Sequence, residues 1–160
     1  SLSTAGGMFI LASMARKLID ENRSLIEVAM ALEQARDKIN IIFSVNDMKP
    51  LRKSGRLGIV RQSVGTILNV RPIFKCVEGA VVSQGMARGS SEQAEYLASC
   101  VPLTASEVYI HYINNYKMTA IITKMLRERN FGGKITLRKL GPVLGVHLGL
   151  SVTGLVWIDN

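Results

Sequence analysis

Cysteine is scarce in this sequence, and long apolar runs are absent from it. Only two cysteines occur, Cys76 and Cys100, and their separation does not match the spacing of metal ligands. We expect both to be free thiols of a cytoplasmic protein, without a disulfide. No apolar run reaches the ~18 residues that a membrane helix needs, because the apolar opening stretch, residues 7–15, is followed by Arg16 and Lys17. The sequence therefore predicts neither a membrane span nor a signal peptide.

Groupings of residues that carry catalysis are also missing. An enzyme needs a nucleophile beside a base, paired carboxylates or a metal cluster, whereas the acidic residues here are spread singly, mostly on predicted helix faces. We interpret His111, in a predicted strand, as a satisfied surface or half-buried histidine. His147 follows a Gly-Pro bend, so we expect a tight turn between two strands to present its ring. Composition alone makes it a capped or packed histidine. We predict no enzyme, no metal and no cofactor.

Apolar residues make up 48% of the 160 residues, enough for a folded core without disulfides. Apolar spacings of three and four predict helices, with expected ranges of 7–21, 24–39, 50–53, 57–67, 89–101 and 118–125. Alternating or β-branched stretches predict strands, with expected ranges of 41–45, 69–75, 80–82, 107–113, 135–137 and 150–158. Residues 141–145 are expected to form a turn or short helix. The similar numbers of helices and strands indicate an α/β or α+β fold.

Local sequence signals indicate where two of these helices begin and which face of one strand is buried. Residues 24–27, Ser-Leu-Ile-Glu, form a capping box, and residues 89–93 predict a second, serine-to-glutamine cap. The strand at 107–113 alternates cleanly. This pattern places one face on the core and puts Tyr109 and His111 on the other face.

Positive charge is concentrated between Met48 and Arg88. This stretch holds eight basic residues against one acid, so it carries a net charge of +7 in a chain whose total is +8. Three interpretations stay open: a solvated basic face, a nucleic-acid-binding surface, or a surface that docks an acidic partner. Phe74 is the only aromatic residue in the stretch, so the stretch has few aromatic side chains on which nucleic-acid bases could stack.

Four motifs occur in this chain in one order. They are Leu51–Leu57 with Gly65–Ile73, Glu78-Gly79, Arg88-Gly89, and Gly141-Pro142-Val143-Leu144-Gly145-Val146-His147. In this order they resemble the DegV family of bacterial lipid-binding proteins. The resemblance implies a central mixed or antiparallel sheet covered by helices.

The resemblance begins in the middle of the family's pattern. It therefore implies a truncated fragment: residues 1–40 would be the helical end of an N-terminal domain, and residues 41–160 a C-terminal α/β domain. The absent N-terminal segment would carry serine and threonine contacts to the ligand. Such a fragment would expose apolar surface, through which a fragment dimer could form.

The resemblance also implies a ligand and a partner. The ligand would be a long-chain fatty acid, with His147 in the hydrogen-bond network of its carboxylate. The family continues after this histidine with x-Gly-Pro-Gly, whereas this chain has residues 148–151, Leu-Gly-Leu-Ser, so the bend can differ. The partner would be a separate fatty acid kinase, docked by Arg56 and Arg88.

An apolar tunnel is needed for the acyl chain. Its candidate lining residues are Met8, Leu11, Ile67, Leu68 and Val70. Apolar residues at these spacings are equally consistent with packing in an ordinary core. Two alternative functions stay open. One is a basic regulatory or nucleic-acid-binding module, and the other is an enzyme whose catalytic groups lie in an absent segment.

Overall fold

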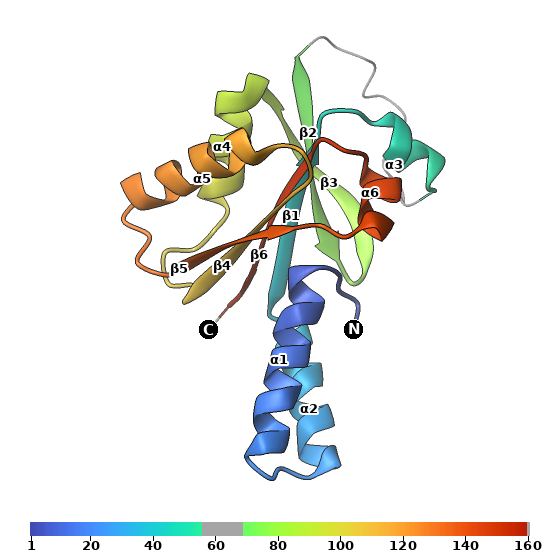
Figure 1. Ribbon diagram of the computed structural model, residues 1–160, viewed down its shortest axis with the longest axis vertical. Coiled ribbons are helices and arrows are strands. Elements are labelled where there is room, and N and C mark those ends of the chain that lie inside the picture. The colour runs from blue at the N-terminus through green and yellow to red at the C-terminus, as the bar shows by residue number, and fades with distance from the viewer. Residues whose placement is uncertain (56–68, 160) are drawn as a thin grey trace.

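The computed structural model describes residues 1–55 and 69–159, which form one sheet with helices on both of its faces (Figure 1). In this part of the chain the strands are β1 Ile39–Val45, β2 Val70–Val77, β3 Ala80–Arg88, β4 Glu107–Tyr112, β5 Lys134–Lys139 and β6 Val152–Ile158. Their order is β3-β2-β1-β6-β4-β5, and all neighbouring pairs are antiparallel except β4 and β5, which are parallel. The predicted α/β class with a mixed sheet is confirmed. The helix predicted at 57–67 lies outside the described residues.

The helices divide between the two faces of the sheet. Their bounds are α1 Gly6–Asp20, α2 Leu25–Arg36, α3 Lys49–Lys53, α4 Gly89–Ser99, α5 Tyr116–Glu128 and α6 Pro142–Leu148. Helices α4 and α5 pack together on one face. Helix α1 begins against the other face and then extends beyond the sheet beside α2, while α3 and α6 contact each other (Figure 1).

The main core lies between the sheet and the α4–α5 pair. Leu97 of α4, Leu126 of α5, and Ile110 and Leu155 of the central strands are all fully buried there. Leu155 lies opposite Ile42 and Ile110 in the flanking strands. These apolar contacts fix which face of each strand points toward α4 and α5, and so which residues remain for the other face.

The prediction that β4 has only one face on the core is wrong. Tyr109 and His111 are 8% and 5% exposed, although they point away from α4 and α5. The start of α1 covers this side of the sheet, and its Ile10 packs against Tyr109 and Val156. Strand β4 is therefore buried on both faces.

The capping box at the start of α2 is confirmed. The Glu27 backbone N–H donates to Ser24 Oγ at 3.3 Å, and the Ser24 N–H donates to Glu27 Oε2 at 2.8 Å. The serine cap predicted for α4 is wrong, because this helix begins at Gly89 and leaves the serines inside its first turn. Arg88 caps it instead, and its backbone N–H donates to Glu92 Oε2 at 2.9 Å.

The two segments provide a matched test of helix capping. We expect Ser24→Ala to lower the free energy of unfolding by about 1 kcal/mol, because the first-turn amide loses its acceptor. Ser90→Ala, where the serine side chain makes no cap, should change it by less than about 0.5 kcal/mol. Urea unfolding followed by circular dichroism measures both. Equal losses would contradict the assignment of the caps.

Candidate functional site

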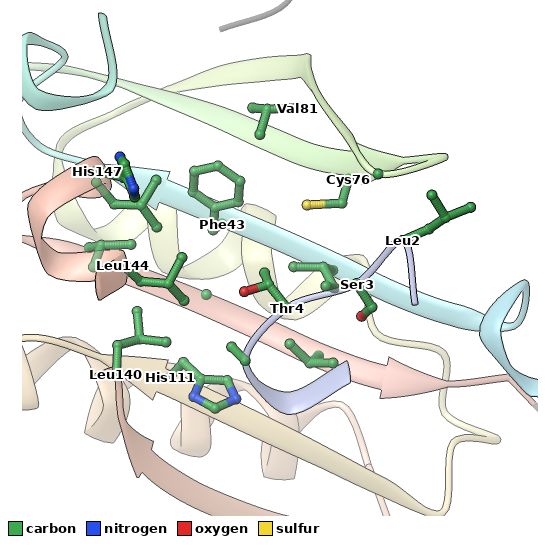
Figure 2. Close-up of a pocket in the computed structure, with 17 residues that line it drawn as sticks. Leu2, Ser3, Thr4, Phe43, Cys76, Val81, His111, Leu140, Leu144 and His147 are labelled. Carbon is green, nitrogen blue, oxygen red and sulfur yellow. The ribbon is translucent and has the colours of Figure 1, made fainter. Parts of the chain in front are cut away.

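A cavity of about 460 Å³ lies on the face of the sheet opposite α4 and α5 (Figure 2). Strands β1 and β6 form its floor, while residues 2–5, α6 and the β2–β3 hairpin surround it. Most of its lining is apolar, including Ile41, Phe43, Val81, Val152 and Val156. A cavity of this size and polarity falls in the range of small-molecule sites.

The floor follows from strand alternation. On β1, Ile41 and Phe43 face the cavity, whereas Ile42 packs on the α4–α5 side. On β6, Gly154 occupies the middle of the floor between two valines. A Cβ at position 154 would lie 3.0 Å from Phe43 Cβ and 3.2 Å from the Ile42 carbonyl oxygen. Glycine therefore allows the close approach of β1 and β6 beneath the cavity.

Helix α6 forms one wall of the cavity. Leu144 and His147 are three residues apart, so both lie on one side of the helix and line the cavity. Val143 and Val146, on the opposite side, are 71% and 75% exposed. The expected tight turn at His147 is therefore wrong, because this residue lies in the last turn of α6 and is half-buried. The helix ends after it at Gly149, whose φ of +84° suits glycine.

His111 also lines the cavity, and its interpretation as a satisfied surface or half-buried histidine is wrong. It is 5% exposed, and within the described residues neither ring nitrogen has a hydrogen-bond partner of good geometry. The start of α1 covers the ring so closely that a Cβ on Gly6 would lie 2.6 Å from Nε2. Burial and the positive charge of Arg138 lower the pKa of His111 to about 4, with the Arg138 backbone partly opposing the shift. The imidazole is therefore neutral near pH 7.

This lowered pKa links stability to pH. Unfolded His111 takes up a proton below about pH 6.5, whereas folded His111 stays neutral down to about 4. Stability should therefore fall as pH drops from 6.5 to 4, by on the order of 3 kcal/mol from this residue. We expect His111→Asn to remove that part of the slope. His147→Asn serves as the control, and urea unfolding across this range measures the difference. A slope unchanged in His111→Asn would contradict the account.

Three predicted tunnel residues lie elsewhere in the fold. Met8 is 53% exposed on α1, Leu11 is buried on the same helix, and Val70 is half-buried at the start of β2. Within the described part of the chain, the lining of the cavity includes none of the three. Ile67 and Leu68 lie outside the described residues. A tunnel role for these residues therefore stays a prediction.

The predicted docking residues are separated from the cavity. Arg88 is exposed at the end of β3, where it caps α4, and Arg56 lies outside the described residues. Lys49, Arg52 and Lys53 of the basic stretch are on α3.

Both cysteine thiols are free, and burial raises the pKa of each. Cys76 lines the cavity, whereas Cys100 follows α4 on the opposite face of the sheet.

The described residues contain neither a metal-binding cluster nor a membrane-spanning helix. Across residues 1–55 and 69–159, no group of three or more histidine, cysteine, aspartate or glutamate side chains is placed to hold a metal ion. No helix in those ranges has both the length and the apolar character needed to cross a membrane.

Fold and site together define an α/β domain with a ligand-sized apolar cavity on one face of its sheet. The family model described as "Uncharacterised protein, DegV family" matches residues 1–160. The chain belongs to the DegV family.

Known relatives agree with this assignment. A DegV domain-containing protein of Clostridium acetobutylicum is 25% identical over 150 residues, which are 90% of this chain and 53% of the relative. The chain thus spans about half the length of the curated relatives it matches. A DegV family protein from Thermus thermophilus, described by its fatty acid binding, has a TM-score of 0.88 and 24% identity, covering 99% of this chain and 59% of that one. The Streptococcus pneumoniae fatty acid kinase (Fak) B3 protein, loaded with linoleic acid, has a TM-score of 0.87 and 21% identity, covering 99% and 58%.

Proposed function

We propose that the full-length protein binds a long-chain fatty acid, with the acyl chain in the apolar cavity between the sheet and α6. The observation that carries this proposal is the cavity itself, about 460 Å³ with a mainly apolar lining. Solved relatives of the same fold are described as binding fatty acids, which supports the ligand class. The protein performs no chemistry on the ligand.

Apolar burial supplies most of the affinity in this proposal. Each methylene removed from water contributes about 0.8 kcal/mol, so a long acyl chain needs few polar contacts. The half-buried Val81, Leu140 and Leu144 already present apolar surface to the cavity. In a preformed site of this kind the side chains are already ordered before the ligand binds, so their ordering does not reduce the affinity.

The carboxylate of the fatty acid lies near His147 in this proposal. An imidazole N–H on the α6 wall can donate to a carboxylate and offset part of its desolvation. The other half of the full-length protein supplies the remaining polar contacts.

The rest of the protein also meets the α1–α2 hairpin. In this proposal residues 1–40 belong to an N-terminal domain and residues 41–160 form the C-terminal domain. The hairpin extends beyond the sheet (Figure 1), and Leu25, Ile26 and Met30 are 82%, 74% and 57% exposed on it. Contact with the missing half would bury this apolar surface.

A separate fatty acid kinase is the proposed partner. The protein presents the bound carboxylate to it, with Arg88 and Arg56 on the docking surface. Guanidinium groups suit this task because they make paired hydrogen bonds to carboxylate or phosphate. The similarity to the fatty acid kinase (Fak) B3 protein supports this choice of partner.

Replacing His147 tests the head-group assignment. In the full-length protein we expect His147→Phe, which keeps a ring but loses the donor, to weaken linoleic acid binding about tenfold. Val146→Phe, one residue away on the exposed side of α6, should leave the affinity unchanged. Isothermal titration measures both variants. Equal affinities for all three proteins would remove His147 from the site, and no binding by the unsubstituted protein would overturn the function.

A further inference from the structure

A second cavity of about 420 Å³ adjoins the apolar one, and its charge is of a single sign. The two cavities share Ala5, His111, Leu140 and Leu144 in their linings. Beyond these, the second cavity is lined by Arg138, Lys139 and Gly141. Among the described residues no carboxylate lines it. Arg138 pairs with His111 in the β4–β5 register, so its side chain lies on the cavity side, whereas strand alternation turns the Lys139 side chain to the other face of the sheet. An anion there would therefore meet the positive charge of Arg138 and no negative one.

The guanidinium of Arg138 is held in place. Its central carbon lies 3.7 Å from the centroid of the Phe9 ring, an arrangement in which a cation is attracted to the ring face. Phe9 in turn packs edge-on against Tyr109 with ring centroids 5.6 Å apart. In the described parts of the chain, neither Arg138 nor Lys139 forms an ion pair with a carboxylate. The charge of Arg138 is thus available to a ligand in the cavity.

His111 supplies an independent sign that this position is built for a polar partner. It lines both cavities, is 5% exposed, and has no hydrogen-bond partner of good geometry at either ring nitrogen in the described residues. Buried polar side chains in folded proteins are nearly always hydrogen-bonded. A neutral imidazole beside the Arg138 cation provides one donor and one acceptor where the apolar cavity meets the basic one.

We propose that the cavity bounded by His111 and Arg138 binds a second carboxylate of the ligand, so that the protein accepts α,ω-dicarboxylic fatty acids. This inference rests on the proposed function, because the chain joining the two carboxylates lies in the apolar cavity. The first carboxylate lies at His147, and the second reaches the basic cavity past Leu140 and Leu144.

Helix α6 sets the separation of the two ends. Gly141, just before the helix, lines the basic cavity, while His147 in its last turn lines the apolar one. Six residues of helix correspond to about 9 Å along its axis. In Figure 2 the Leu144 side chain lies between the His111 and His147 rings. A diacid must bridge this distance, so the preference for a second carboxylate should peak at one chain length.

The test compares diacids with monoacids on the full-length protein. A homologous series of saturated α,ω-dicarboxylic acids and the monocarboxylic acids of matching length are titrated calorimetrically. At the best length we expect the diacid to bind about tenfold more tightly than its monoacid, the effect of one charge-assisted contact. R138Q should lose this preference and keep its monoacid affinity, whereas K139Q, whose side chain lies on the other face of the sheet, should keep both.

A control variant tests whether the loss of any two positive charges would have the same effect on diacid binding. K117Q/K124Q removes two cations from α5 on the opposite face of the sheet, and it should keep the full diacid preference. Monoacid binding by R138Q also shows that this variant is folded. Monoacid binding without a diacid preference at any length would overturn the inference and leave the proposed function standing, as would a preference that persists in R138Q. Failure to bind monoacids as well would overturn both.

Discussion

The Val81→Trp variant of the full-length protein should bind fatty acid about a hundredfold more weakly than the unsubstituted protein. Val81 lies on β3, half-buried, and lines the cavity beside Phe43 and Cys76 (Figure 2). An indole ring there fills space that about four methylenes of the ligand would occupy. At about 0.8 kcal/mol for each methylene, the loss is about 3 kcal/mol, or about a hundredfold in affinity.

The neighbouring residue provides the control for this variant. Val82 pairs with the exposed Lys75 of β2, and strand alternation turns it away from the cavity. Val82→Trp should therefore bind fatty acid normally, although it adds the same ring to the same strand. Titration with linoleic acid compares the two. Undiminished binding by Val81→Trp would place the ligand somewhere other than this cavity.

The largest loss of stability is expected from Leu155→Ala. Leu155 is fully buried in the main core on β6, on the face toward α4 and α5. Truncation removes its packing and leaves a cavity, which typically costs about 2–5 kcal/mol in the free energy of unfolding. Because the side chain points away from the ligand cavity, fatty acid affinity should stay unchanged wherever the variant is folded.

Leu150→Ala is the matched control for that variant. Leu150 is 64% exposed just before β6, so its truncation should change the free energy of unfolding by less than about 0.5 kcal/mol. Urea unfolding measures both variants. A cost at position 150 equal to that at 155 would contradict the assignment of the core.

The elements that the sequence predicted well are those set by neighbouring residues. The capping box of Ser24 and Glu27 needs only a hydroxyl and a carboxylate three residues apart, and it is present. The strands predicted at 69–75 and 80–82 are also present as a pair, and Glu78 and Gly79 between them adopt positive φ values of 50° and 79°. Family motifs gave the fold class, which the sheet and its helices confirm.

The elements predicted poorly depend on partners far away in the chain. The burial of His111 comes from the start of α1, more than a hundred residues earlier, and no alternation within β4 could reveal it. The cavity arises where β1, β6 and α6 meet, so Phe43 and Val156 looked like ordinary strand residues. Apolar spacing pointed instead to Met8 and Leu11, because helix periodicity marks a buried face without saying what covers it.

Native mass spectrometry of the full-length protein as purified, followed by organic extraction and identification of the released molecules, tests the central claim most directly. The account predicts a mass excess equal to one long-chain fatty acid on most molecules, and the same fatty acid in the extract. Val81→Trp, purified in parallel, should carry little or none. A full-length protein that purifies without lipid and takes up no added fatty acid would contradict the account.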